Sequence, residues 1–169
     1  MKKIKKIIIF YPSYENGGAT KNLQNLITFF TNKNIFVKLI TGNARYSNFN
    51  YKKKRFEIIK PKKIMSLFFF QRVNYSFSVL RLFFENIRFI DSKNTVILSM
   101  QSHLLSVLSC KFLSKKIIIR NSEDPFGATK YADEKFLSIL VFFSKFINFN
   151  FSDGIITNSK KSLDSIKFF

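Results

Sequence analysis

Residues Ile4–Tyr11 read IKKIIIFY, and residues 12–18 directly after them read PSYENGG. The short β-branched run is typical of a strand that is buried on both faces of a parallel sheet. After the two glycines, apolar side chains recur at positions 19, 23, 26, 27 and 30. This spacing marks one face of an amphipathic helix. A strand, a glycine-containing loop and a helix in this order predict the start of a Rossmann-like α/β fold.

The same alternation of short apolar runs and helical segments continues along the chain. We expect further strands near 35–41, 95–99, 116–120 and 154–158, with a short additional strand within 55–60. Helices are expected over about 68–90, 104–112 and 133–149, and from residue 160 onward. Strands that alternate with helices predict βαβ crossovers, and therefore one parallel sheet flanked by helices. In such a sheet, ligands bind at the carboxyl ends of the strands. We expect the loops 12–18, 99–103 and 121–128 to lie at that edge.

The composition of the chain limits its partners. The 169 residues include 29 Lys and Arg against 10 Asp and Glu, a net charge of +19. This charge favours an anionic partner, such as nucleic acid, an acidic membrane surface or a phosphorylated small molecule. Cys110 is the only cysteine and His103 the only histidine. A disulfide framework is therefore excluded, and no metal site is expected.

Membrane insertion is not expected from the sequence. A transmembrane helix needs roughly 20 consecutive apolar residues, and the most apolar stretch, 136–151, is interrupted by Lys145, Asn148 and Asn150. The apolar run near the N-terminus is too short for a signal peptide. We expect a cytoplasmic protein that can also associate with the inner face of a membrane.

The strand-end loops hold the candidate site residues. Gly17 and Gly18 precede a helix, where backbone N–H groups attract anions, but a plain strand-to-helix turn explains them equally well. His103 follows a strand and can transfer a proton or donate to a ligand oxygen, or can simply bond to the backbone at the helix start. Arg120, at the end of another strand, can bind a phosphate or carboxylate. Pairing of Arg120 with Glu123 or Asp124 is the structural alternative.

Two further features have both a structural and a functional interpretation. The basic run Lys52, Lys53, Lys54 and Arg55 is expected to be a solvated loop, or else a contact for anionic lipid or phosphate. The aromatic sets are 68–70 and Phe142, Phe143, Phe146 and Phe149. We expect these side chains mainly in the core, with an apolar surface against a membrane or lipid-linked substrate as the alternative. Ser159 is expected to cap the last helix.

Five pieces of the sequence, taken in order, resemble the N-terminal domain of the family 4 glycosyltransferases, retaining enzymes with the GT-B fold. They are the opening strand, Gly-Gly loop and helix at 6–23, the second strand at 34–41, Ser102-His103 with the helix after it, the strand and loop at 117–122, and the strand after a Ser-Asp pair at 151–159. The resemblance covers nearly the whole chain. It implies a Rossmann-like parallel sheet that forms half of a GT-B fold.

The resemblance also implies an activity and roles for the candidate residues. The family transfers a sugar from a nucleotide-sugar, a co-substrate rather than a bound cofactor, to a glycan or polyprenyl-linked acceptor. By resemblance, Gly17 and Gly18 lie at the donor phosphates. His103, the candidate catalytic residue, Arg120 and Glu123 line the donor and acceptor cleft. Many members carry a histidine in the loop after the fifth strand, where this chain has Arg-Asn-Ser-Glu-Asp.

In the family, a second Rossmann-like domain binds most of the nucleotide-sugar. We expect residues 1–169 to form a single acceptor-side domain without that donor domain, which a separate chain can supply. The chain alone is then expected to lack a complete active site. A non-catalytic binding module is the main rival hypothesis. Nucleic-acid binding is the weaker rival, because it rests on charge alone and the sequence contains no recognised RNA or DNA motif.

Overall fold

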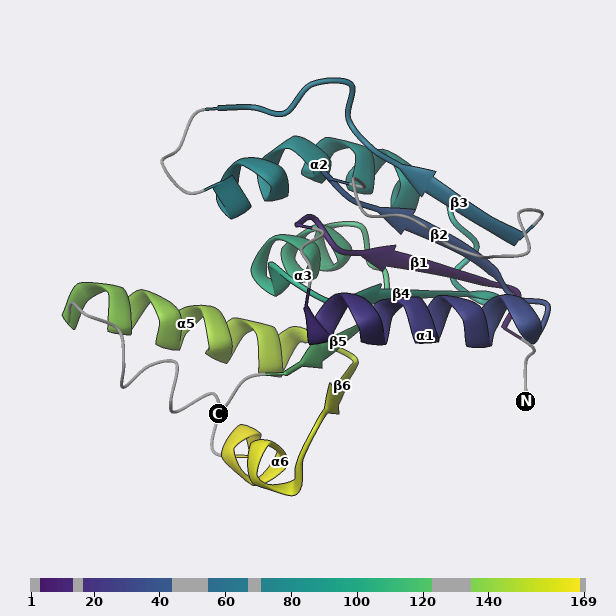
Figure 1. Cartoon of the computed structure of the whole chain (residues 1–169). Helices are drawn as coiled ribbons and strands as arrows, with labels where there is room; N and C mark the ends of the chain where they lie inside the picture. The colour runs from purple at the N-terminus through teal and green to yellow at the C-terminus, as the bar shows by residue number, and fades with distance from the viewer. Residues whose placement is uncertain (1–3, 14–16, 44–54, 67–70, 123–134, 168–169) are drawn as a thin grey trace.

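The structure is a computed structural model of the chain that describes residues 4–13, 17–43, 55–66, 71–122 and 135–167. These residues form a six-stranded parallel sheet in the order β3-β2-β1-β4-β5-β6 (Figure 1). The strands are β1 (Lys6–Phe10), β2 (Phe36–Ile40), β3 (Phe56–Ile59), β4 (Thr95–Ser99), β5 (Ile117–Asn121) and β6 (Gly154–Thr157). The helices are α1 (Gly18–Asn32), α2 (Gln71–Arg88), α3 (His103–Phe112), α5 (Lys135–Phe151) and α6 (Lys160–Ile166). The predicted Rossmann-like α/β architecture is confirmed.

The strand register brings the ends of the central strands to one level. Phe10, at the end of β1, pairs with Ile40 of β2 on one side and with Ser99 of β4 on the other. The chain runs outward from β1 to β3 and then returns to place β4 on the other side of β1. This reversal of strand order opens a crevice between the loops that follow β1 and β4.

The central strand β1 is buried on both faces, as its β-branched run predicted. Ile8 and Phe10 pack on the face covered by α2 and α3, where the Phe10 and Phe83 ring centroids lie 4.6 Å apart. Ile7 and Ile9 pack on the opposite face with Leu23 of α1. Figure 1 shows α1 on one side of the sheet and α2 and α3 on the other. Two apolar cores, one on each face, therefore hold the sheet between the helices.

Cys110 belongs to the core on the α2–α3 face. Its side chain is fully buried, and this burial raises the pKa of the thiol to about 12. The nearby Asp153 carboxylate adds to the effect, and Lys111 opposes it. Cys110 is therefore a small apolar core residue rather than a reactive thiol.

Asp153 joins the first residues of β5 and β6. Its Oδ2 accepts hydrogen bonds from the Ile117 amide at 2.9 Å and from Lys111 Nζ at 3.1 Å, while its own amide donates to the Ile117 carbonyl at 2.8 Å. Partial burial acts to raise the pKa of this carboxyl, but the hydrogen bonds and the Lys111 and Lys116 charges outweigh it and hold the pKa below its usual value. Asp153, the second residue of the Ser-Asp pair before the last strand, thus has a structural role. Ser159 caps α6 by accepting from the Ser162 amide, as predicted.

The expectation that the α5 phenylalanines lie mainly in the core is wrong for three of them. Phe149 is buried, whereas Phe142, Phe143 and Phe146 are 41%, 57% and 42% exposed. Together with exposed Ile139 they occupy positions i, i+3, i+4 and i+7, which form one stripe along a helix. The stripe points away from the sheet because α5 turns another side, which includes Asn148, toward the molecule. Residues 68–70 lie outside the described residues.

Within the described ranges, no helix combines the length and apolarity that a membrane crossing requires.

Candidate functional site

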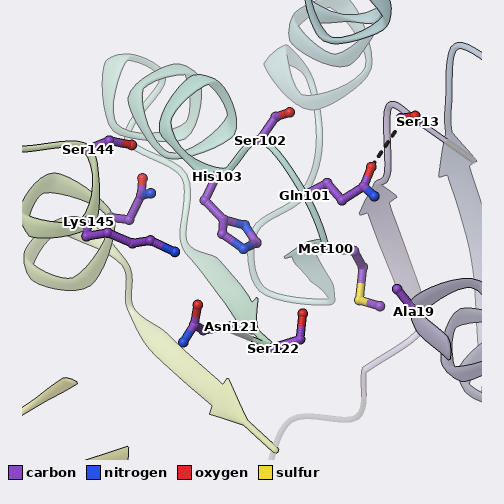
Figure 2. Close-up of a pocket in the computed structure, with 11 residues that line it drawn as sticks. Ser13, Ala19, Met100, Gln101, Ser102, His103, Asn121, Ser122, Ser144 and Lys145 are labelled. Atoms are coloured by element: carbon purple, nitrogen blue, oxygen red, sulfur yellow. Dashed lines mark hydrogen bonds between the residues drawn. The ribbon is translucent and has the colours of Figure 1, made fainter. Parts of the chain in front are cut away.

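A pocket of about 420 Å³ lies at the carboxyl edge of β1, β4 and β5 (Figure 2). Its lining comes from the loop after β1 and the start of α1 (Ser13, Ala19), the segment after β4 (Met100, Gln101, Ser102, His103), the end of β5 (Asn121, Ser122) and α5 (Ser144, Lys145, Asn148). This is the edge at which ligands bind in open parallel sheets. The loops after β1, β4 and β5 meet here, as the sequence predicted, as far as the structure describes them.

The loop after β1 approaches the pocket at the beginning of α1. Gly17 precedes the helix in an extended conformation, and no side chain caps the first turn. A Cβ added at Gly17 or Gly18 would meet nothing within 4 Å, and both residues are exposed. A ligand can therefore approach the backbone closely at both positions. The next residue, Ala19, lines the pocket.

The loops after β1 and β4 are joined across the top of the sheet. The Ser13 amide donates to Gln101 Oε1 at 3.2 Å (Figure 2), and the Met100 amide donates to the Phe10 carbonyl at 3.0 Å. These bonds hold the two pocket walls in register. In the part of the pocket that the structure describes, hydrogen bonds between the strand ends thus hold the lining in place.

His103 is the first residue of α3, and its ring points toward the cavity (Figure 2). Its Nδ1 lies 2.9 Å from Ser99 Oγ, which is also 3.1 Å from the Gln101 carbonyl. Ser106 Oγ lies 2.8 Å from Ser99 Oγ. Ser99 has only one hydroxyl hydrogen. When that hydrogen goes to the Gln101 carbonyl, His103 Nδ1 donates to Ser99 and Nε2 is the basic nitrogen. When it goes to Nδ1, Nε2 carries the proton. The tautomer of His103 is therefore coupled to the direction in which the buried Ser99 hydroxyl donates.

Ser102, which directly precedes α3, has a left-handed backbone conformation with φ 51° and ψ 46°. A non-glycine residue in this region is strained, and such strain persists only where neighbouring contacts enforce it. Here Ser102 Oγ lies 2.6 Å from Ser76 Oγ of α2. The strained residue lies in the pocket wall next to His103, so α2 contributes to the geometry of the site.

Arg120 does not line the pocket. Its side chain is 7% exposed, and its Nη2 donates to Asn158 Oδ1 at 2.9 Å. Side chains alternate between the two faces of a strand, and it is the neighbouring Asn121, followed by Ser122, that borders the cavity. Arg120 therefore joins β5 to the segment after β6, next to the site rather than within it. Glu123 lies outside the described residues.

Arg55 lies at the opposite edge of the sheet. Its Nη1 donates to the Asn34 carbonyl at 3.0 Å, and together with Lys5 and Lys33 it lines a groove of about 490 Å³ near the amino ends of β1 and β2. Arg55 therefore does not contribute to the strand-end pocket. Lys52, Lys53 and Lys54 lie outside the described residues.

The α5 wall is the part of the site that sequence reasoning missed. Ser144, Lys145 and Asn148 occupy positions i, i+1 and i+4 and line the pocket. This side of the helix is opposite the apolar stripe of Ile139, Phe142, Phe143 and Phe146. Lys145 and Asn148 were interpreted only as interruptions of an apolar stretch, although together with Ser144 they occur at helical spacing.

The pocket lining determines the chemistry that the site can support. It consists mainly of hydroxyl and amide side chains, with Lys145 and His103 as its titratable groups and no carboxylate among the described lining residues. No group of three or more potential metal ligands occurs in the parts of the chain that the structure describes. Such a lining suits a hydroxyl-rich ligand, and Lys145 adds a positive charge to it.

Comparisons with known proteins identify the fold. No protein-family model matches the sequence, and no curated protein matches it either. Among solved structures, Anabaena HepE in complex with UDP and glucose matches with a TM-score of 0.61 and 11% identity, over 97% of this chain and 41% of HepE. A UGT transferase from Siraitia grosvenorii in complex with UDP matches with a TM-score of 0.65 and 12% identity, over 95% of this chain and 47% of that protein. Arabidopsis thaliana UGT89C1 complexed with UDP-L-rhamnose matches with a TM-score of 0.63 and 11% identity, over 97% of this chain and 44% of UGT89C1.

The chain spans less than half the length of each of these proteins. Identities of this size relate folds rather than activities, and the resemblance to family 4 in particular stays a prediction. The chain forms a Rossmann-like domain, and its fold is one that GT-B glycosyltransferases contain.

Proposed function

We propose that the chain is the acceptor-side half of a glycosyltransferase that moves a sugar from a nucleotide-sugar to a glycan or lipid-linked acceptor. The observation that carries the proposal is a hydroxyl- and amide-lined pocket at the reversal of strand order, in a fold shared with proteins that bind UDP, UDP-glucose and UDP-L-rhamnose. Crevices at this position are the usual ligand sites of open α/β sheets.

Each side chain has a defined role in this proposal. The donor phosphates approach the exposed backbone at Gly17 and Gly18, where the α1 N-terminus favours negative charge. His103, whose tautomer depends on Ser99, orients or deprotonates an acceptor hydroxyl. Arg120 acts indirectly, by holding the end of β5 to Asn158. Glu123 keeps the role in the donor and acceptor cleft that the resemblance to family 4 implies.

The other wall of the cleft is proposed to come from a second domain. The chain covers 41–47% of HepE and the two plant proteins. Sugar transfer depends on positioning and on charge stabilisation in a site that excludes water, and one open wall provides neither fully. We therefore propose that a donor-binding domain, in the same polypeptide or in a partner chain, completes the active site.

The two sides of α5 support a lipid-linked acceptor. One side of this helix lines the pocket, and the opposite side carries the exposed stripe of Ile139, Phe142, Phe143 and Phe146. An apolar stripe on a chain with a net charge of +19 suits an anionic membrane surface. A helix placed in this way would bring the pocket next to a membrane-anchored acceptor.

The donor part of the proposal is tested by titrating the ¹⁵N-labelled chain with UDP, followed by amide chemical shifts. Shifts at Gly17, Gly18 and Ala19 are expected at millimolar UDP or below. Gly18→Val should remove them while leaving the remaining spectrum intact, because its side chain meets open space. A Kd of 1 mM corresponds to only about 4 kcal/mol of binding free energy, and about 10 mM UDP is well above it. A spectrum that does not change at this UDP concentration would contradict the proposal.

A further inference from the structure

A groove lies at the amino edge of the sheet, at the end of β1 opposite to the strand-end pocket. Its volume is about 490 Å³, and its lining comes from the segment before β1 (Ile4, Lys5), the turn after α1 (Lys33, Asn34, Ile35) and the residue before β3 (Arg55). Lys5 precedes β1 and Tyr11 follows it, so the strand, at about 3.3 Å per residue, separates the two cavities by roughly 20 Å. A ligand in this amino-edge groove is therefore remote from the proposed sugar-transfer site.

The amino-edge groove is positively charged. Lys5, Lys33 and Arg55 are exposed, and no carboxylate occurs among the lining residues that the structure describes. The two lysine ammonium groups have neither a hydrogen bond nor an ion pair with a described residue. Glu57 on β3, the strand that Arg55 precedes, pairs instead with Lys38 of β2 at 3.1 Å. The groove thus gathers three positive charges that no described side chain balances.

The end of α1 does not account for these charges. A cation near a helix C-terminus stabilises the helix dipole, which applies to Lys33, but Lys5 and Arg55 belong to other segments. The carbonyls of residues 29–31 already accept hydrogen bonds from the amides of residues 33–35. The negative end of a helix amounts to about half an elementary charge, against three full positive charges in the groove. An anion is therefore still attracted.

The turn after α1 holds Arg55 in place at the groove. Asn34 has a left-handed backbone conformation with φ 60°, and its carbonyl accepts from Arg55 Nη1 at 3.0 Å. A guanidinium group has five N–H donors in one plane, so the others stay available to a ligand. A fixed fork of donors suits the oxygens of a phosphate group, and lysines add charge without demanding one geometry.

We propose that the amino-edge groove is a second ligand site of the chain, in which Lys5, Lys33 and Arg55 bind a phosphate group. The phosphate can belong to a soluble phosphorylated molecule or to a lipid headgroup, because both present the same charged oxygens. This inference does not depend on the proposed function, since it uses other residues at the other edge of the sheet.

The soluble source is tested by titrating the ¹⁵N-labelled chain with inorganic diphosphate at an ionic strength kept constant with sodium chloride. Backbone amide signals of Lys5, Lys33, Asn34 and Arg55 should shift, with a Kd of about 1 mM. Lys33→Gln and Arg55→Gln should each weaken binding about two- to fivefold, the effect of one exposed charge pair. Lys160→Gln is the matched control, because it removes the same charge from an exposed position on α6. Equal weakening by all three variants would show an effect of net charge alone and overturn the inference.

The lipid source is tested by sedimentation with vesicles of phosphatidylglycerol and phosphatidylcholine. Vesicle binding that Arg55→Gln weakens more than Lys160→Gln, and that diphosphate competes for, would assign the groove to a lipid headgroup. Vesicle binding that is equal in both variants, together with diphosphate binding that depends on Arg55, would assign it to a soluble phosphate. Dependence on Arg55 in neither assay would refute the inference.

A titration with UDP separates this inference from the proposed function. UDP shifts at Gly17–Ala19, without a response of the amino-edge groove to diphosphate, would refute the second site and leave the proposed donor site standing. Groove shifts that depend on Arg55, without a UDP response at Gly17–Ala19, would support the second site and contradict the proposed donor site.

Discussion

The hydrogen bonds of Asp153 give a stability prediction that can be measured on the chain itself. Asp153→Ala removes the acceptor for the Ile117 amide and the partner of Lys111 Nζ, at 2.9 and 3.1 Å. The partly buried Ile117 amide, the first of β5, is then left without this acceptor. Because β5 and β6 begin at this point, the substitution should loosen the outer half of the sheet. It should lower the free energy of unfolding without changing the pocket residues.

The size of the effect follows from the environment of the carboxylate. A hydrogen bond to a charged group contributes about 1.5–3 kcal/mol when it is buried. The Asp153 side chain is 30% exposed and that of Lys111 38% exposed, so solvent screens the ion pair, which adds less than about 1 kcal/mol. We expect Asp153→Ala to cost about 2 kcal/mol. For a chain of this size, that loss corresponds to a decrease in Tm of about 4–8 °C.

The pH dependence gives the sharpest check. The pKa of Asp153 in the folded chain lies below its ordinary value of 3.8. Its contribution is therefore fully present above the pKa of the unfolded state and is lost as the pH falls through the folded-state pKa. Urea unfolding of the unmodified chain and of Asp153→Asn, followed by circular dichroism, should differ equally at pH 7 and pH 6 and clearly less at pH 3.

A stability difference that persists undiminished at pH 3 would refute this reasoning. Asp164→Asn is the matched control, because its pair with Lys167, at 3.2 Å, has both side chains more than half exposed. This control should change stability by less than about 0.5 kcal/mol.

Three further predictions concern the loops and the exposed helix. Gly42→Ala should lower the free energy of unfolding in urea by about 1–3 kcal/mol, because its Cβ would lie 2.7 Å from Tyr75 Cδ1 and 3.1 Å from the Pro12 carbonyl oxygen. Gly18→Ala is the control, because a Cβ there meets open space, and it should leave the unfolding midpoint nearly unchanged. Ser99→Ala should lower the rate of sugar transfer at least tenfold once a donor domain is supplied, because it removes the hydrogen bond between Ser99 Oγ and His103 Nδ1 that orients the ring. A radiolabelled nucleotide-sugar assay, with Ser109→Ala as the control on α3, measures this, and equal rates would contradict it. Phe143→Glu should reduce sedimentation with anionic liposomes, while binding by the unmodified chain should weaken in high salt; equal binding to neutral and anionic vesicles would exclude the electrostatic part.

The strands were predictable because their residues carry a local signal. Ile7 to Phe10 and Ile117 to Ile119 are apolar runs of strand length, and a strand buried on both faces needs little else. Their parallel pairing followed from the alternation of strands and helices, which is typical of βαβ units. The glycine loop and His103 could be placed at the sheet edge for the same reason.

The remaining parts of the site depend on contacts that the local sequence does not encode. The partner of Arg120, Asn158, lies 38 residues further along the chain, so only the pairing of β5 with β6 brings them together. In α5 the difficulty was different. A helix with apolar residues on most sides has a weak directional signal, so the side that faces the pocket could not be distinguished from the side that faces solvent.

The burial of Cys110 has a practical consequence for biophysical work. At neutral pH, its thiolate population is about a thousandfold lower than that of a thiol with the ordinary pKa of 9.0, and no other cysteine is present. A cysteine introduced at an exposed position, such as 150 on α5, would therefore be the only site modified by maleimide reagents. Fluorophores or spin labels can thus be attached one at a time without removing Cys110 and disturbing the core. Distances from such labels to a membrane or to an added donor domain could then be measured on an otherwise unmodified chain.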